Sequence, residues 1–316
     1  MRLVVMAYQD IGYVCLDELF SLGADIAAVV THRDDPHEAI WFRSVAERAR
    51  SAGVPVLEPA SVNSPEVVDE IARLAPDMIL SFYFREILSR DILALPSQGA
   101  LNLHGSLLPR YRGRCPVNWV LVHGETETGV TLHHMELRPD TGDIVAQRAV
   151  PIADEDTALT LNRKLGAAAR ALLRETFPRL VAGTAPRIPQ DHTRASYFGG
   201  RRPEDGRMVW SQTARQLYNL VRAVTHPYPG AFTWWREQQL FVWRAQAFDE
   251  APVAAPGEVV AISSQGILVA AGTGALLLDQ VQLAGTDEQP AREFAARVGL
   301  VVGDQLGKLC AIRPTW

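Results

Sequence analysis

The chain has 316 residues, of which 47% are apolar and 21% are charged. This length exceeds what one hydrophobic core usually serves, so the sequence predicts two domains, and the composition excludes an intrinsically disordered protein. The formal net charge is -5, with Lys and Arg scattered along the chain, which argues against a partner held through many phosphates, such as tRNA.

The spacing of the cysteines and the length of the apolar stretches indicate the cellular compartment of the protein. Three cysteines lie far apart and form no CxxC pair, which favours buried free thiols in a reducing compartment over a zinc site: Cys15, Cys115 and Cys310. The N-terminus has no charged segment followed by a long apolar one, and the apolar stretch 267–278 is too short to span a membrane. The sequence therefore predicts a cytoplasmic protein without a metal site and without membrane insertion.

The first part of the chain alternates short apolar runs with longer amphipathic ones. The apolar runs read as buried parallel strands at residues 3–7, 26–31, 78–82 and 100–103. Apolar residues at helical spacing predict helices at residues 11–22, 44–52 and 64–74, the last with a cap at Ser64 and Pro65. This alternation is typical of an α/β fold with a Rossmann-like, doubly wound, mostly parallel sheet.

From residue 105 onward, the sequence pattern predicts a long loop, two further strands and a long helix. Residues 105–115, rich in Arg and Gly, predict a long loop, and strands at 129–135 and 144–152 flank a turn at 138–142. A long helix is expected at 159–180. The Pro- and Gly-containing stretch that follows is the best linker candidate, so we expect a catalytic domain over 1–188 and a linker over 189–206.

The remaining chain carries one helix and then short β-like runs. The helix is expected at 213–224, and the strands at residues 231–235, 240–243, 259–262, 266–270 and 275–278. Short strands separated by turn residues predict a small β-barrel resembling the oligonucleotide-binding fold over residues 207–305, followed by a tail at 306–316.

Asn102 and His104 are the first candidates for chemistry. They lie two residues apart at the end of an apolar strand, so their side chains leave the same face, at the edge of the sheet where open α/β folds bind ligands. An imidazole can move a proton near neutral pH and a carboxamide can donate to a developing oxyanion; Asp140 is a carboxylate that could orient the imidazole. From these residues alone, structural hydrogen bonding is the more common role for such a pair.

The motifs around Asn102 and His104 favour a catalytic role over a structural one. The strings ALNLHGSLLPRYRG at 100–113 and PDTGDI at 139–144 resemble the motifs of the folate-dependent formyltransferases, which include enzymes acting on methionyl-tRNA, glycinamide ribonucleotide and nucleotide sugars. The resemblance implies that 10-formyltetrahydrofolate is the co-substrate, that Asn102 stabilises the oxyanion, that His104 handles the proton, and that Asp140 supports His104.

Within the family, the chain is most similar to the formyltransferase domains of polymyxin resistance, which act on UDP-4-amino-4-deoxy-L-arabinose for lipid A modification. The similar segments are MAYQD at 6–10, THRDDP at 31–36, SFYFR at 81–85, NWVLV at 118–122, GETETGVTLH at 124–133 and FGGRRP at 198–203. The similarity extends over about the first 300 residues. It implies a UDP-aminosugar as acceptor and no nucleic-acid partner; the oligomeric state and the exact aminosugar stay open.

The resemblance also implies a folate site, for which a flat pterin ring suits backbone groups between apolar walls. Its residues would be Glu86, Ile87, Leu88, Arg114, Glu136, Leu137, Arg138 and Pro139. For Ile87 and Leu88, simple core packing is an equal alternative, and for Glu86 a solvated position at a helix start is. An equal alternative for Arg114 is that it is an exposed cation in a loop without a ligand. A sugar-nucleotide diphosphate calls for arginines, and Arg201 and Arg202 are the candidates, although surface solvation is the more common role.

Three other functions compete with this one. A methionyl-tRNA formyltransferase shares the two-domain plan, but we would expect it to carry a basic insertion where this chain has the acidic segment 34–38. A nucleic-acid-binding module with a degenerate enzyme domain would have no reason to keep Asn102, His104 and Asp140 together. A formyl-folate hydrolase, with water in place of the amine, stays open.

Overall fold

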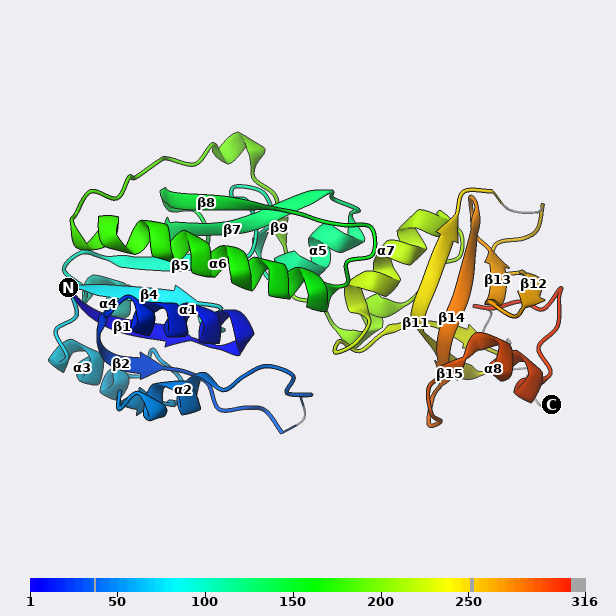
Figure 1. Cartoon of the computed structure of the whole chain (residues 1–316), viewed down its shortest axis with the longest axis horizontal. Coiled ribbons are helices and arrows are strands. Elements are labelled where there is room, and N and C mark those ends of the chain that lie inside the picture. The colour runs from blue at the N-terminus through cyan, green and yellow to red at the C-terminus, as the bar shows by residue number, and fades with distance from the viewer. Residues whose placement is uncertain (37, 251–252, 308–316) are drawn as a thin grey trace, which may run out of the picture. The chain divides into compact units, whose positions relative to one another are not determined.

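The structure is a computed structural model, and it describes residues 1–36, 38–250 and 253–307. The chain divides into two compact units. The first unit comprises Met1–Pro116, Thr126–Ala153 and Thr160–Gly199. The second comprises Val117–Glu125, Asp154–Leu159 and the chain from Gly200 onward. Each unit has its own sheet, and the two are described separately (Figure 1).

The first unit is built on a seven-stranded sheet in the order β3-β2-β1-β4-β5-β7-β8. Its strands are β1 (Arg2–Ala7), β2 (Asp25–Val30), β3 (Val56–Leu57), β4 (Met78–Phe82), β5 (Ala100–His104), β7 (Glu127–His134) and β8 (Ile144–Pro151). The first five are parallel, whereas β7 runs antiparallel to both β5 and β8. The predicted doubly wound, mostly parallel α/β sheet is confirmed.

Helices cover both faces of this sheet. They are α1 (Gln9–Ser21), α2 (Val45–Ser51), α3 (Pro65–Arg73), α4 (Arg90–Ala94) and α6 (Ala158–Val181). In Figure 1, α1 and α6 run side by side along one face; a Cβ added at Gly166 of α6 would contact Ile11 and Val14 of α1. On the other face, α3 and α4 pack on β1 and β4 through apolar residues that include Met6, Ile71, Ile79 and Ile92.

Local sequence explains where several helices begin. Ser44 accepts a hydrogen bond from the Glu47 N–H at 3.2 Å, and Ser89 caps α4 in the same way, so each satisfies a free N–H of the first turn. Ser64 was predicted as the cap of α3, but its side chain accepts no such bond. Pro65 at the first helical position starts that helix instead, because its fixed φ suits a helix and it lacks an N–H to satisfy.

The segment predicted as a linker contributes structure to the first unit. β6 (Arg112–Gly113) in the predicted loop pairs in parallel with β9 (Tyr197–Phe198), and Ile188 bridges Ile144 at the start of β8. A short 3-10 helix, η1 (His192–Arg194), lies between them. This segment therefore contacts β8 through Ile188 and, from Gln190 to Phe198, the loop that follows β5.

The second unit is an antiparallel sheet in the order β10-β11-β14-β13-β12, with β15 paired to β14. The strands are β10 (Ala231–Trp235), β11 (Gln238–Phe248), β12 (Val259–Ser263), β13 (Gly266–Ala270), β14 (Ala275–Leu283) and β15 (Gln289–Pro290). Its helical elements are α5 (Pro116–Val122), η2 (Pro203–Gly206), α7 (Ala214–Val224) and α8 (Ala291–Val298). The prediction of a separate C-terminal antiparallel β domain is confirmed, whereas α5, α8 and β15 were not predicted.

The remaining sequence expectations concern cysteines and membranes. Cys15 is fully buried, which raises the pKa of its thiol, and Cys115 is partly buried. Cys310 lies outside the described residues. Among the residues that the structure describes, no helix combines the length and apolar character needed to cross a membrane.

Candidate active site

The structure brings Asn102, His104 and Asp140 together. Asn102 and His104 lie on β5, and Asp140 lies in the turn between β7 and β8. The His104 Nδ1 atom is 3.6 Å from the Asp140 Oδ1 atom, and both side chains are about nine-tenths buried. Residues 36 positions apart in sequence thus form one buried cluster of imidazole and carboxylate, with a carboxamide beside it.

A second imidazole, that of His133, joins the cluster. β5 and β7 pair in a register that sets Asn102 opposite His133. The His133 Nε2 atom is 3.2 Å from the Asn102 Nδ2 atom and 3.5 Å from the Asp140 Oδ1 atom, and only 2% of its side chain is exposed. The sequence analysis named His133 only as part of a longer motif. Its role escaped prediction because the antiparallel register of β7 on β5 cannot be read from local sequence.

Hydrogen bonds restrict where protons lie on these two rings. The His104 Nε2 atom is 2.7 Å from the Tyr111 carbonyl oxygen, and a carbonyl only accepts, so Nε2 carries a proton. Nδ1 then meets the Asp140 carboxylate favourably when it too is protonated, as imidazolium. The His133 Nδ1 atom donates to the His134 carbonyl at 2.8 Å, which leaves His133 Nε2 to accept from Asn102 or, when protonated, to donate to Asp140.

Asp140 is held in its ionised form. Burial by itself would raise the pKa of this carboxyl group, but the charge of His104, the hydrogen bond with His133 and the 2.8 Å hydrogen bond from the Gly113 N–H outweigh burial. The pKa of Asp140 is therefore well below its ordinary value. Its backbone adopts φ of 59°, in the left-handed region, so neighbouring contacts must hold the turn in place.

The loop after β4 contains the first predicted folate residues. The Glu86 carboxylate accepts hydrogen bonds from Ser61 Oγ at 2.9 Å and from the Val62 N–H, which fixes this loop against the one preceding α3. The Ile87 carbonyl accepts from the Asn63 side chain at 2.9 Å, whereas the Ile87 side chain is 68% exposed. Leu88 is buried in the core. Ile87 is thus an exposed apolar side chain on a loop that hydrogen bonds hold in place.

The other predicted folate residues lie on exposed parts of the first unit. Glu136, Leu137, Arg138 and Pro139 are all exposed in the turn that leads to Asp140. Tyr197 of β9 donates from its hydroxyl to the Pro139 carbonyl at 2.6 Å, and the Arg138 guanidinium lies 5.5 Å from the Tyr197 ring centroid. Arg114 is exposed, and its N–H donates to the Phe198 carbonyl. Tyr197, which the sequence analysis did not select, therefore supports the outer part of this turn.

The two predicted diphosphate-binding arginines belong to the second unit. The Arg201 guanidinium lies 4.6 Å from the Trp119 ring centroid and donates to the Asp205 carbonyl at 2.9 Å. The Arg202 N–H donates to the Asp205 carboxylate. The contacts seen here hold the turn at η2 together.

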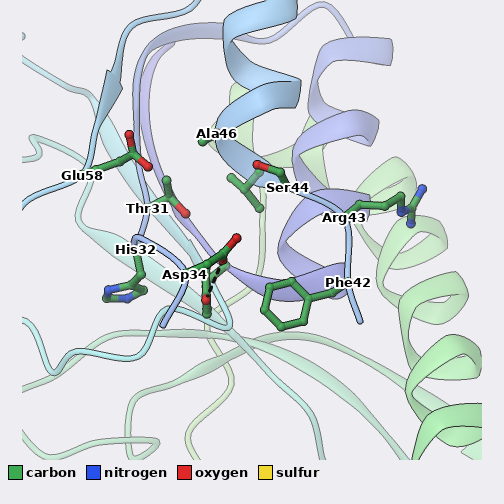
Figure 2. Close-up of a pocket in the computed structure, with 10 residues that line it drawn as sticks. Thr31, His32, Asp34, Phe42, Arg43, Ser44, Ala46 and Glu58 are labelled. Carbon is green, nitrogen blue, oxygen red and sulfur yellow. Dashed lines mark hydrogen bonds between the residues drawn. The ribbon is translucent and has the colours of Figure 1, made fainter. Parts of the chain in front are cut away.

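A separate small cavity of about 40 Å³ lies at the ends of β1 and β2 in the first unit (Figure 2). Polar side chains of Thr31, Asp34 and Glu58 face it together with Phe42 and Ser44. Asp34 accepts a hydrogen bond from the Tyr8 hydroxyl at 3.0 Å. Burial, and to a smaller extent this hydrogen bond, raise the pKa of Tyr8 to about 12. The cavity is of the size of one or two water molecules, so it is too small for a pterin.

Within residues 1–36, 38–250 and 253–307, no group of three or more His, Cys, Asp or Glu side chains is arranged to hold a metal ion. The cluster around Asp140 offers proton carriers and a carboxamide donor, which are the groups that acyl transfer to an amine requires.

Fold, cluster and motifs together define a class of enzyme that transfers a one-carbon acyl group. A family model described as formyl transferase matches residues 8–177, and a model of the formyl transferase C-terminal domain matches residues 201–299. The chain belongs to the formyl transferase family, and it is a formyltransferase.

Solved structures with the same fold have low sequence identity to this chain. HypX from Aquifex aeolicus, solved in complex with tetrahydrofolic acid, is 17% identical with a TM-score of 0.65; the match covers 96% of this chain and 48% of HypX. This chain therefore spans about half the length of HypX. An N-formyltransferase from Helicobacter canadensis, in complex with folinic acid and dTDP-3-aminofucose, is 19% identical with a TM-score of 0.69, covering 87% of this chain and 98% of that one.

A methionyl-tRNA formyltransferase from Clostridium thermocellum also matches. It is 16% identical with a TM-score of 0.56, and the match covers 78% of this chain and 93% of that chain. At such identities, these similarities establish a shared fold and leave the acceptor undecided.

Proposed function

We propose that this enzyme transfers the formyl group of 10-formyltetrahydrofolate to the 4-amino group of UDP-4-amino-4-deoxy-L-arabinose in the cytoplasm, yielding the UDP-4-formamido sugar used in lipid A modification. The observation that carries the proposal is the convergence of Asn102, His104 and Asp140, with Asp140 ionised and 3.6 Å from His104. The folate ligands of the HypX and Helicobacter canadensis structures support the donor, and dTDP-3-aminofucose in the latter supports an aminosugar nucleotide as acceptor.

The chemistry assigned to these residues follows from their atoms. The unprotonated amine attacks the formyl carbon, a carbon–nitrogen bond forms, and the carbonyl oxygen gains negative charge. Neutral His104 takes a proton from the attacking amine, and the imidazolium so formed stabilises that charge together with a free N–H of the Asn102 carboxamide. Collapse breaks the bond to the folate nitrogen, and His104 gives its proton to this leaving group, which returns the imidazole to its neutral form. The Asp140 carboxylate stabilises the imidazolium and fixes its orientation.

The substrate contacts are proposed from exposure and charge. For the folate, we assign the exposed apolar side chains of Ile87 and Leu137, the adjoining backbone of Glu86 and Leu88, and the turn of Glu136, Arg138 and Pro139. Arg114 is assigned to the folate because its side chain is exposed. Arg201 and Arg202 are assigned to the diphosphate of the nucleotide by their charge alone.

Formylation of methionyl-tRNA is the second candidate, because the Clostridium thermocellum enzyme that bears this name shares the fold. The net charge of -5 favours the sugar nucleotide, since tRNA binding draws its affinity mainly from basic surface. Another nucleotide aminosugar is a closer alternative, because the same site chemistry would serve it.

A mass-spectrometric assay decides the acceptor. The enzyme is incubated with 10-formyltetrahydrofolate and one acceptor in each of three reactions. The acceptors are UDP-4-amino-4-deoxy-L-arabinose, a nucleotide 3-aminosugar and methionyl-tRNA, and the mass of each is measured for the addition of one formyl group. We expect the first to gain it, and the His104→Ala variant to leave it unmodified. Formylation of methionyl-tRNA alone, or formate release without an acceptor, would refute the proposal.

A further inference from the structure

Gln190 is a buried side chain in the segment that the sequence predicts as a linker. Its exposed fraction is 6%. The Nε2 group donates to the Asp140 carbonyl at 3.0 Å and to the Gly142 carbonyl at 2.7 Å, and the Oε1 atom accepts from the Arg112 guanidinium at 2.6 Å. One carboxamide therefore connects the turn that carries Asp140 to the loop that follows β5.

The turn depends on such external support. Asp140 has a left-handed backbone, which is a strained conformation for a non-glycine residue. The two carbonyls that Gln190 satisfies would lose this donor if its amide were removed, and a buried carbonyl without a donor destabilises the fold. Gln190 thus offsets a strain located at the residue whose carboxylate faces His104.

The other end of the carboxamide fixes the partner loop. Arg112 is 2% exposed, and its own N–H donates to the Ser196 carbonyl at 2.9 Å. The next residue, Gly113, donates its N–H to the Asp140 carboxylate at 2.8 Å. Gln190 therefore joins the same two segments that the Gly113–Asp140 hydrogen bond joins, and it does so next to that bond.

We propose that Gln190 is a positioning residue for formyl transfer: by joining the Asp140 turn to the Arg112 loop, it keeps the Asp140 carboxylate directed at His104. This inference rests on the proposed function for its kinetic consequence. Its structural part, the placement of the carboxylate, is measurable without turnover.

The test compares Gln190→Met with His192→Ala in the full chain. Met matches Gln in length but makes none of the three hydrogen bonds. His192 provides the matched control, because its Nδ1 atom accepts from the same Arg112 guanidinium at 2.9 Å. Within the part of the chain that the structure describes, no hydrogen bond joins His192 to the Asp140 turn. We expect Gln190→Met to lower kcat about 10- to 100-fold, as small displacements of reacting groups do. KM for donor and acceptor should change less than about threefold, and His192→Ala should stay within about threefold of the parent in kcat.

A second readout follows Asp140 directly. The carboxyl carbon of Asp140 is titrated by ¹³C NMR in the parent and in each variant. Gln190→Met should raise the pKa of Asp140 toward its ordinary value, because the carboxylate moves away from His104 and the Gly113 N–H. Gln190→Glu keeps the acceptor for Arg112, loses both donors and adds a negative charge near Asp140, so it should raise the pKa of Asp140 further while preserving the fold, as checked by circular dichroism.

Two results would overturn the positioning role. One is an unchanged Asp140 titration in both Gln190 variants, and the other is a kcat for Gln190→Met within about twofold of the parent. If the parent protein formylates no amine, the proposed function fails, but the Asp140 titration still decides whether Gln190 holds the carboxylate. The two failures are therefore distinguishable.

Discussion

At the scale of single residues, the site depends on which atoms carry protons. The Tyr111 carbonyl and the Asp140 carboxylate face the two nitrogens of His104, so the ring is bracketed by acceptors. These two acceptors would hold the imidazolium that forms when His104 takes a proton from the amine, and that imidazolium can stabilise an oxyanion and protonate a leaving nitrogen. Because the pKa of Asp140 is depressed, the carboxylate is ionised throughout the neutral range, and its stabilising effect is lost only in strong acid, as the pH falls through its folded-state pKa.

We expect His104→Ala and Asp140→Asn to lower kcat by about 100-fold or more while the dissociation constant of the folate changes by less than about threefold, because both residues act on the transition state. The measurements are steady-state kinetics and fluorescence titration of the folate. Leu107→Ala, which alters a nearby side chain outside the cluster, is the comparison. A weakened folate affinity with unchanged kcat would contradict the assigned roles.

At the scale of elements, charge pairs join three helices of the first unit. The Glu18 carboxylate of α1 is 1% exposed and accepts a two-pronged bond from Arg174 of α6 at 2.8 and 3.0 Å. Arg170 of α6 and Arg48 of α2 both pair with Asp17, the neighbour of Glu18, at 2.9 Å. These contacts orient α6 along α1, and α6 follows the strands that flank the Asp140 turn.

Glu18→Gln should lower the free energy of unfolding by about 1–3 kcal/mol, because hydrogen bonds to a buried charged group exceed those at the surface. Glu175→Gln on α6 is the control: Glu175 is 67% exposed and pairs with Arg148 at the surface, so its loss should cost less than about 1 kcal/mol. Urea unfolding monitored by circular dichroism measures both variants. Equal losses in the two would show that burial of Glu18 adds nothing to its ion pairs.

At the scale of the whole molecule, charge bears on the acceptor. The chain carries 31 Lys and Arg against 36 Asp and Glu, which gives it a surplus of negative charge. A ligand with two phosphates can be bound by one or two arginines, whereas tRNA requires an extended basic surface. The family assignment leaves the acceptor open, and the net charge is the property on which we base the preference for a sugar nucleotide in our proposal.

We therefore expect bulk tRNA at about 10 μM and physiological salt not to inhibit formylation of the aminosugar nucleotide, since nonspecific binding to nucleic acid draws its affinity from basic surface and this chain has a net charge of -5. Formylation rates with and without tRNA, repeated at low salt, measure this. Strong inhibition that weakens steeply as salt is added would indicate a basic binding surface and favour methionyl-tRNA as acceptor.

Sequence alone determined the fold class, and it named three residues that the structure brings together, Asn102, His104 and Asp140. Continuous apolar runs such as 78–82 are specific to strands buried on both faces, and β4 occupies those residues. Asn102 and His104 could be paired by their spacing on one strand. Asp140 could be named as a candidate carboxylate in the turn near Gly142, and the resemblance to the family motif then implied its role beside His104. The domain limits at 188 and 206 stay a prediction.

Only the tertiary structure decided what surrounds those residues. His133 joins the cluster through an antiparallel register, and Gln190 reaches the Asp140 turn from 50 positions away in a segment whose Pro and Gly content predicts a linker. The short helices α5 and α8 were missed because a few turns give too little periodicity to detect. Hydrogen bonds between distant segments leave no periodic trace in sequence, since they depend on where folding brings the backbone.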